Sequence, residues 1–252
     1  MSERGTGLPA SFERAWGVRE RPTKGPKAGL SLERVVAAGV AVAADEGIGA
    51  VSMSRVAKEL GTSAMSLYRY VAAKDELLAL MVDAALGSMP DIAGDDGWRA
   101  GLERWAWAEL AAYRRHPWAM QVPINAPPIT PNQIAYLEQG LRCLGGAPLQ
   151  PHEKMSVILT VSSFTRSWAS LTGQINQAFA TGDQAALDMM ANYGTLLTTL
   201  TDPAEFPALH EVLAANVFDP AGDGNDEMPD EDFVFGLARL LDGIAVLIDS
   251  RG

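Results

Sequence analysis

The sequence predicts an all-α protein, with a small N-terminal domain followed by a larger helical one. Apolar residues recur at helical spacing along almost the whole chain. No segment shows the strict alternation of apolar and polar residues that marks a half-buried strand. Glycine and proline interrupt the pattern at residues 90–97, 117–131, 145–151 and 219–230, and such breaks usually mark loops.

The chain of 252 residues is expected to divide into three regions. Residues 1–29, rich in glycine, proline and charge, are expected to form a flexible basic arm. Residues 30–80 are expected to form a three-helix domain with a helix-turn-helix, and residues 81–252 a helical bundle. The helices are expected at residues 31–46, 53–60, 64–70, 75–87, 98–115, 131–144, 152–180, 183–200, 204–216 and 231–249.

The net charge of −11 looks unfavourable for a protein that binds DNA, but it is unevenly distributed. Residues 1–29 hold six basic and three acidic residues, residues 30–80 hold five and six, and residues 81–252 hold nine and 22. Phosphate repels an acidic surface, so a DNA contact is expected at the N-terminal end. The arm's basic residues could lie along DNA, and a tail without function is an equally good interpretation.

The chain has a single cysteine, Cys143, which excludes an internal disulfide and favours a reducing cytoplasm. We expect Cys143 to be a small apolar residue on a helix. The N-terminus has no apolar segment of the signal-peptide kind. The last apolar stretch, residues 237–248, is interrupted by Arg239 and Asp242, so no membrane span is expected.

Residues 51–78 read VSMSRVAKELGTSAMSLYRYVAAKDELL and carry the functional prediction. The first short helix has an apolar face of residues at helical spacing, namely Met53, Val56, Ala57 and Leu60. Ser52 is suited to cap its start. Gly61 follows the helix directly, where a residue with a left-handed conformation is needed.

A second short helix follows this glycine, and Ser63 is suited to cap it. Leu67 and Val71 are expected to point inward. Two short helices across a glycine turn form a helix-turn-helix, whose second helix enters the major groove of DNA.

The residues around this motif are candidates for two kinds of DNA contact. Small, hydroxyl and methyl-bearing side chains can approach base edges, whereas tyrosine and lysine can hold phosphates. Tyr68, Tyr70 and Lys74 are the expected phosphate contacts, and Lys74 precedes a helix whose N-terminal amides would add to its charge. The complete predicted set is Ser52, Ser54, Thr62, Ser63, Ala64, Met65, Ser66, Tyr68, Arg69, Tyr70 and Lys74.

The pattern resembles the tetracycline-repressor (TetR) family of transcriptional regulators. The resemblance rests on Val56, Ala57, Leu60, Gly61, Ser66, Leu67, Tyr68, Tyr70, Lys74, Leu77 and Leu78, and it covers roughly residues 30–86. In two respects the sequence departs from the family pattern. Val71 stands where the family often has phenylalanine, and Ala64 and Met65 carry no strong hydrogen-bond donor. Base reading is therefore expected to rely more on Arg69, on Ser54 or on DNA shape.

The resemblance implies a homodimer whose C-terminal helices bind a small molecule. The candidate wall residues are Trp105, Tyr113, Met120, Asn125, Tyr136, Phe164, Trp168 and Gln174. A pocket lined by them would be mostly apolar with a few polar anchors, so an apolar or aromatic effector is expected. Each residue taken singly is more often part of a core.

Two helices, at 152–180 and 231–249, carry apolar stripes that fit a four-helix dimer interface of C2 symmetry. The function expected from these features is a ligand-responsive repressor on a palindromic DNA operator. Effector binding would favour a dimer whose recognition helices no longer match major grooves about 34 Å apart. A transcriptional activator, or a regulator that needs no ligand, is the alternative within the same fold.

Other classes of protein are less well supported. His116, His152 and His210 are scattered and match no catalytic or metal-binding spacing, so no enzyme is expected. The seven acidic residues within 219–232 do not fit a calcium loop, and no cofactor is expected. An interaction module or a helical small-molecule-binding protein would not need the phosphate-contacting set of residues.

Overall fold

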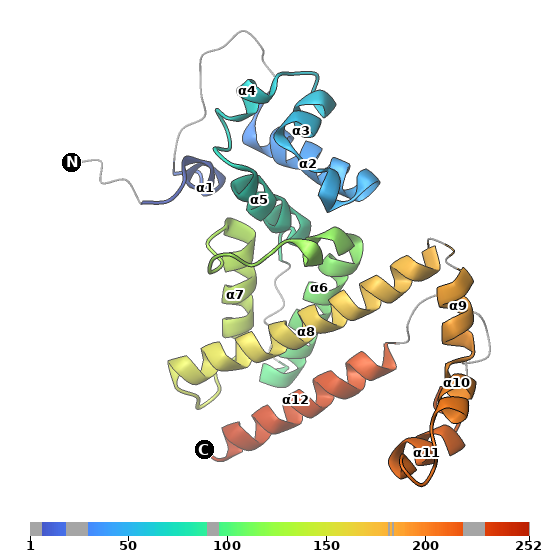
Figure 1. Ribbon diagram of the computed structural model, residues 1–252. Coiled ribbons are helices and arrows are strands. Elements are labelled where there is room, and N and C mark those ends of the chain that lie inside the picture. Colours follow the sequence, from blue (N-terminus) through green and yellow to red (C-terminus); the bar gives the residue numbers. More distant parts are fainter. Residues whose placement is uncertain are drawn as a thin grey trace. The chain divides into compact units, whose positions relative to one another are not determined.

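The computed structural model in Figure 1 describes residues 7–18, 30–89, 96–180, 182, 184–218 and 230–251. These residues form helices and turns without a strand, which confirms the all-α class. The elements are α1 (Ala10–Ala15), α2 (Leu32–Glu46), η1 (Ile48–Ala50), α3 (Met53–Glu59), α4 (Ala64–Leu67), α5 (Lys74–Leu86), α6 (Gly97–Arg115), η2 (Pro117–Gln121), α7 (Pro131–Cys143), α8 (Pro151–Ala180), α9 (Gln184–Ala191), α10 (Tyr193–Leu200), α11 (Pro207–Ala214) and α12 (Glu231–Asp249).

The chain divides into two compact units. The first comprises residues 1–170 and 233–252, and the second comprises residues 171–232. Helix α8 belongs to the first unit up to Ser170.

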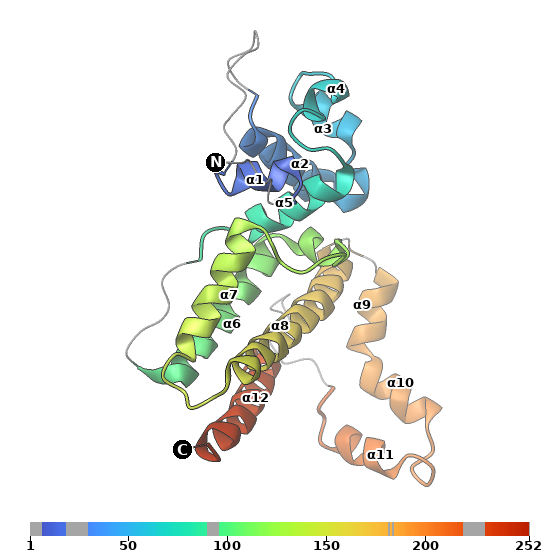
Figure 2. The same cartoon turned by 90° about the vertical axis from the view of Figure 1, so that its left-hand side faces the viewer.

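The N-terminal part of the first unit packs α1 to α5 around one core, seen from two sides in Figures 1 and 2. Ser31 caps α2, because its hydroxyl accepts the backbone N–H of Arg34 at 3.3 Å. Helix α2 ends at Gly47, whose φ of 82° suits glycine. The most deeply buried side chains of this core are Val35, Val42, Val51, Val56, Leu67, Val71, Leu77 and Met81.

Residues 10–15 form helix α1, although the sequence predicts a flexible arm there. Phe12 is 8 % exposed and packs into the N-terminal core. The Ser11 hydroxyl donates to Glu76 Oε2 on α5 at 2.6 Å. The prediction is wrong for this segment because a helix of six residues is too short to show a hydrophobic period. Its anchors are tertiary contacts that only the fold brings together.

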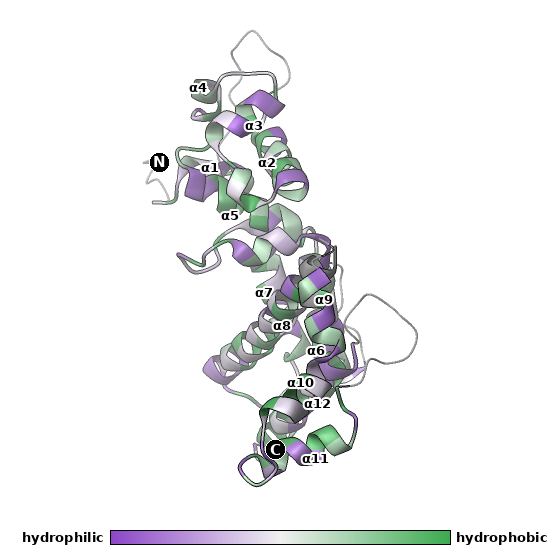
Figure 3. Cartoon of the chain, turned by 45° about the vertical axis from the view of Figure 1, so that its right-hand side comes forward, coloured by the Kyte–Doolittle hydropathy of each residue, from purple (hydrophilic) through white to green (hydrophobic). Residues whose placement is uncertain are grey.

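A second core lies among α6, α7, α12 and the first-unit part of α8. Its most deeply buried side chains are Leu102, Leu110, Leu144, Val161, Phe233 and Leu241. Gly140 lets α7 approach its neighbours closely. A Cβ atom at this position would lie 2.8 Å from Ile158 Cδ1 and 3.0 Å from Trp105 Cε2. Both hydrophobic and hydrophilic residues occur along these helices (Figure 3), as is expected of amphipathic helices that bury one face.

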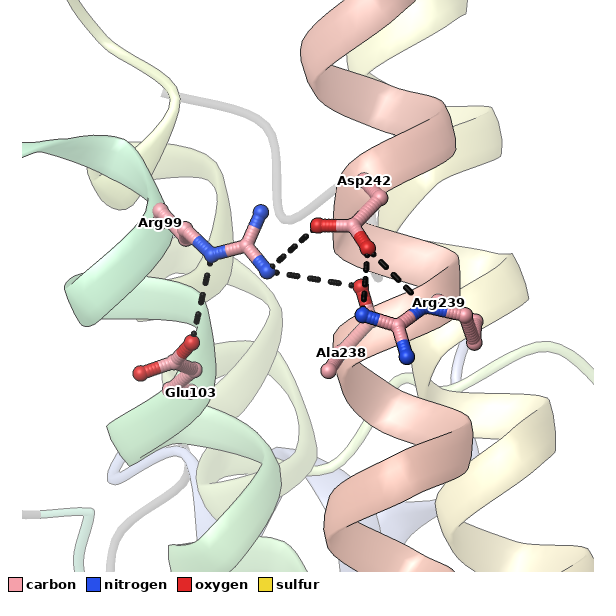
Figure 4. Close-up of polar contacts among 5 residues, drawn as sticks. All are labelled: Arg99, Glu103, Ala238, Arg239 and Asp242. Atoms are coloured by element: carbon pink, nitrogen blue, oxygen red, sulfur yellow. Dashed lines mark hydrogen bonds and ion pairs between the residues drawn. The ribbon is translucent and has the colours of Figure 1, made fainter.

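Polar contacts at the surface join α6 to α12 (Figure 4). The Arg99 guanidinium donates to Asp242 Oδ1 at 2.8 Å and to the Ala238 carbonyl at 3.4 Å. Asp242 also accepts from Arg239 at 2.7 Å, and Arg99 lies 3.4 Å from Glu103 Oε1. Exposed ion pairs add little stability, so their main effect is to favour one rotation of α12 against α6.

Two predicted helix boundaries differ from the structure. The helix expected at 183–200 is two helices, α9 and α10, separated at Asn192. The Asn192 side-chain amide donates to the Asp188 carbonyl at 2.8 Å, and such local bonds compete with helix propagation. The helix expected at 204–216 is limited to α11, which begins at Pro207.

Two segments with predicted roles lie outside the described residues. They are the rest of the basic arm, at 1–6 and 19–29, and most of the acidic loop, at 219–229. Among the residues that are described, no helix is both long and apolar enough to cross a membrane.

Replacing Phe12 with alanine tests whether α1 is an integral part of the N-terminal core. Phe12→Ala is expected to lower the free energy of unfolding by about 3 kcal/mol, because it removes a buried aromatic ring. The measurement is urea denaturation followed by circular dichroism. Phe235→Ala is the matched control, since Phe235 on α12 is 63 % exposed. Equal stability of the two variants would contradict the packing of α1.

Candidate nucleic-acid interface and interior polar cluster

The helix-turn-helix is formed by α3, the turn at Gly61 and α4. The Ser52 hydroxyl accepts the Arg55 backbone N–H at 3.1 Å, which confirms the predicted cap. Gly61 has a φ of 62°. The Thr62 N–H reaches back to the Ala57 carbonyl at 2.9 Å, so the end of α3 closes as a left-handed glycine motif.

Helix α4 is shorter than the predicted 64–70, because regular helix ends at Leu67. Backbone bonds continue the turn, with Tyr70 N–H donating to the Leu67 carbonyl at 2.8 Å. Leu67 and Val71 are both buried, as predicted, so they fix the motif against the core. Ser63 occupies the cap position, but its hydroxyl bonds the Ser66 hydroxyl at 2.9 Å, so the predicted side-chain cap is wrong.

The outward side chains of the motif are those expected to meet DNA. Met65 is 76 % exposed and Tyr68 is 48 % exposed. The other exposed members of the predicted set are Ser52, Ser54, Ser63, Arg69 and Lys74, whereas Thr62, Ala64 and Ser66 are half-buried. Arg69 and Lys74 have no carboxylate partner among the described residues, so their charges remain available to an anion.

Tyr70 and Arg55 make contacts within the domain. The Tyr70 hydroxyl donates to the Leu30 carbonyl at 2.9 Å, and the Tyr70 carbonyl accepts from Arg14 at 3.1 Å. Arg55 bonds Glu46 Oε1 at 2.9 Å and Glu59 Oε2 at 2.8 Å. The Arg55 hydrogen bond holds the pKa of Glu46 below its ordinary value. Tyr68 and Lys74 therefore remain better phosphate candidates than Tyr70.

A polar cluster lies inside the C-terminal helices, between α6 and α8. Glu109 is 5 % exposed, and its Oε1 accepts the hydroxyls of Tyr113 at 3.1 Å and Ser162 at 2.8 Å. Arg166 donates to the Tyr113 hydroxyl at 3.2 Å, with its guanidinium carbon 5.3 Å from the ring centroid. Burial raises the pKa of Glu109 to about 7. Burial also raises the pKa of Tyr113, with the Glu109 charge adding to the effect.

The predicted effector residues separate into two groups. Six lie in or beside the second core, namely Trp105, Tyr113, Met120, Tyr136, Phe164 and Trp168. Trp105 Nε1 donates to the Tyr136 carbonyl at 2.8 Å, and the Phe164 ring stacks on Phe233 at 5.4 Å. The other two are not brought to this core, since Asn125 is on an exposed loop and Gln174 belongs to the second compact unit.

The two cores of the first unit meet at α5 and the start of α7. Asp83 on α5 is 7 % exposed, and its Oδ1 accepts the backbone N–H groups of Asn132 at 2.9 Å and Gln133 at 3.0 Å. Tyr136 donates its hydroxyl to the Leu86 carbonyl at 3.2 Å. Burial raises the pKa of Asp83, whereas the Thr130 hydroxyl and the backbone N–H groups of Gln133 and Asn132 oppose that rise. A carboxylate from one helix thus caps the other.

A shallow groove of about 280 Å³ runs between α8 and α12. Its walls are Glu153, Ser156, Val157, Thr160, Leu240, Gly243, Ile244 and Leu247. Much of the apolar stripe predicted for dimerisation is used internally, because Phe233, Leu237 and Leu241 on α12 are buried. Leu159 on α8 and Val246 on α12 remain exposed, at 68 % and 71 %.

Comparison with known proteins identifies the family. The family model described as "Bacterial regulatory proteins, tetR family" matches residues 35–81, and "Tetracyclin repressor-like, C-terminal domain" matches residues 89–248. The chain is 38 % identical over 250 residues to the HTH-type transcriptional repressor DrrR1 of Streptomyces coeruleorubidus, covering 96 % of this chain and 87 % of that protein. The chain belongs to the TetR family.

Solved structures of the TetR family have the same fold. Apo ActR from Streptomyces coelicolor matches with a TM-score of 0.69 and 25 % identity, covering 89 % of this chain and all of that one (100 %). ActR in complex with actinorhodin matches with a TM-score of 0.69 and 23 % identity, covering 87 % and 98 % of the two chains. The TetR family is therefore confirmed as the sequence predicted it, as is the helix-turn-helix regulator class.

Sequence reasoning missed four residues that the TetR fold brings into these sites. They are Asp83, Glu109, Ser162 and Arg166. One signal for Glu109 was available, because it shares helical spacing with the apolar residues Leu102, Trp105 and Tyr113. No comparable signal marks Asp83, whose partners are 49 and 50 residues away in the chain.

The raised pKa of Glu109 predicts a specific pH dependence of stability. Its folded pKa of about 7 lies above its ordinary value of 4.5, so the folded state binds the proton more tightly than the unfolded state does. This contribution is fully present below pH 4.5 and is lost as the pH rises through 7. Wild type should therefore lose stability relative to Glu109→Gln between those pH values, by on the order of 3 kcal/mol.

Urea denaturation of both proteins at several pH values measures this difference. Glu103→Gln is the control, because Glu103 lies on the same helix with an exposed carboxylate. A difference between wild type and Glu109→Gln that stays constant from pH 5 to pH 8 would contradict the burial of a titrating carboxyl.

Proposed function

We propose that this chain is a ligand-responsive repressor that binds a palindromic DNA operator as a homodimer. In this proposal a small, mostly apolar or aromatic molecule binds among the C-terminal helices and releases the protein from DNA. The observation that carries the DNA-binding part is the exposed surface of the helix-turn-helix. Its apolar face is filled by the domain core, whereas Met65, Tyr68, Arg69 and Lys74 have no packing role to account for them.

The relatives support the regulatory part. DrrR1 is named a transcriptional repressor, and ActR has been crystallised with actinorhodin and with (S)-DNPA. In our proposal the same general arrangement holds here, with aromatic residues and the Glu109 cluster forming the interior of the effector-binding domain. Activation in place of repression is the alternative within this family.

Charge supports a contact made by the N-terminal end. The helix-turn-helix domain is nearly neutral and residues 81–252 are strongly acidic, so DNA attraction must come from a few residues. Lys74 is the first residue of α5, where the helix amides favour an anion. Tyr68 lies six residues before Lys74 and is also exposed.

We propose that the dimer forms on the outer faces of α8 and α12, around the groove between them. Ser156, Thr160 and Gly243 give this surface small residues that permit close helix approach, and Leu159 and Val246 add exposed apolar area. A C2 axis through this face would use the same residues from both copies. The dimer then sets the separation of the two recognition helices.

We propose that α5 transmits effector binding to the DNA contact. This helix begins at Lys74 and ends at Leu86, so its 13 residues span about 20 Å. Its N-terminal end belongs to the DNA-binding surface, and its C-terminal end is bonded to α7 by Asp83 and Tyr136. A movement of α7 around a bound molecule would therefore tilt α5 and the attached helix-turn-helix.

No catalysis is part of this proposal. His116 follows the end of α6, His152 lies on α8, and His210 bonds the Thr201 hydroxyl at 2.9 Å, so the three come from different parts of the fold. Among the described residues no group of three or more His, Cys, Asp or Glu is placed to hold a metal ion. A regulator of this kind acts in the cytoplasm, where bacterial DNA lies.

The DNA contact is tested with Tyr68→Ala and Lys74→Ala. Both should weaken binding to all duplexes, and Lys74→Ala should reduce the slope of log affinity against log salt by about 1, because one phosphate contact is lost. The measurement is a salt series of gel shifts with DNA from upstream of the protein's own gene. Tyr70→Phe is the matched control, since it loses only the bond to Leu30. Unchanged affinity in both alanine variants would remove this surface from the proposal.

A further inference from the structure

The second carboxylate oxygen of Glu109 has no partner. Tyr113 and Ser162 both donate to Oε1, while Oε2 is buried without a hydrogen bond. A buried carboxyl oxygen left in this state is destabilising, so its retention in a core needs an explanation. Asp83 is equally buried, yet its carboxylate is used to cap α7. The Oε2 atom of Glu109, in contrast, makes no hydrogen bond that would join two helices.

Arg166 on α8 covers part of the polar cluster. Arg166 is half-buried, and its guanidinium covers the Tyr113 ring and donates to the Tyr113 hydroxyl. Ser162 is also half-buried. Arg166 and Ser162 are therefore the least buried members of the cluster, whereas Glu109 and Tyr113 are buried.

The charged and titratable groups around Glu109 are few. Tyr113 lies on its own helix, Arg166 lies on α8, and Tyr136 on α7 is close enough for the Glu109 charge to raise its pKa. Arg166 lowers the pKa of Glu109, but it is the smallest of the contributions and does not offset burial. The negative charge of Glu109 is therefore undercompensated, and a cation would stabilise it.

We propose that Glu109 Oε2 is an anchor for the effector, and that the effector is an aromatic molecule bearing a protonated amine. This inference rests on the proposed function and adds the chemical class of the ligand to it. The amine would donate a hydrogen bond to Oε2, the oxygen that lacks a partner. The aromatic part would pack on Trp105 and Tyr136, which belong to the neighbouring core.

Binding of such an amine is linked to a proton. Near pH 7 the Glu109 carboxyl is partly protonated, so formation of the ion pair sends the carboxyl proton to the buffer, and the ammonium keeps its own protons. A neutral alcohol of the same shape would release no proton. Affinity and proton release are therefore two separate readouts of the same contact.

The test uses three matched probes, 2-naphthylmethylamine, 2-naphthalenemethanol and 2-naphthoate, with isothermal titration calorimetry in two buffers of different ionisation enthalpy. The amine is expected to bind wild type at least tenfold more tightly than the alcohol, with release of about half a proton at pH 7, and the carboxylate should bind most weakly. Glu109→Gln should abolish both the preference and the proton release. Glu103→Gln, on the exposed side of α6, should change neither.

Ser162→Ala gives a second reading that keeps the carboxyl in place. It removes one donor to Oε1, so the pKa of Glu109 should rise further and the proton release should increase, with the amine preference kept. Absent amine binding, an equal affinity for the alcohol, or a preference that survives Glu109→Gln would each overturn the anchor. Release of DNA by a neutral or anionic aromatic molecule would overturn the anchor and leave the repressor proposal standing. Amine binding through Glu109 without any change in DNA affinity would keep the anchor and overturn the proposal of a ligand-responsive repressor.

Discussion

The capping of α7 by the buried carboxylate of Asp83 is the interaction on which the relation between the two cores of the first unit depends. Helix α5 contributes Leu77, Leu80 and Met81 to the N-terminal core, and Leu86 to the second core. Asp83 lies between these positions and accepts two N–H groups at the start of α7. Thr130, at the cap position of α7, makes no such bond itself, so the cap comes from another helix. Because Asp83 on α5 caps the start of α7, the start of α7 cannot move independently of α5.

The two buried carboxyls of the first unit therefore have different roles. Asp83 joins two helices, and burial together with its helix-capping bonds fixes one geometry. Glu109 has donors on one oxygen only, and its Oε2 is buried without a hydrogen bond. The bonds to Asp83 join two helices, whereas the unpartnered Oε2 of Glu109 joins nothing and is available to a ligand. In our proposal, this contrast separates Asp83, which joins two helices, from Glu109, which anchors the effector.

Local sequence chemistry was enough for the helix-turn-helix. Ser52, Gly61 and the spacing of Met53, Val56 and Ala57 each act within a few residues, so the sequence alone places them. The hydrogen bond of Tyr70 could not be predicted in the same way, because its partner Leu30 lies 40 residues earlier. Helix α1, Asp83 and the bond from Ser162 to Glu109 were missed for the same reason, since their contacts join residues far apart in the chain. The predicted boundary after residue 80 falls within α5, because that helix serves both cores.

In our proposal, helix α5 couples DNA binding to the C-terminal helices. Coupling between two sites is reciprocal, so DNA must act on α7 just as an effector must act on the DNA contact. The most direct measurement is hydrogen exchange of the Asn132 and Gln133 amides, which donate to Asp83, with and without an operator duplex. Coupling through α5 should slow the exchange of these amides when DNA is bound. Changes in exchange confined to residues 30–80 would contradict it.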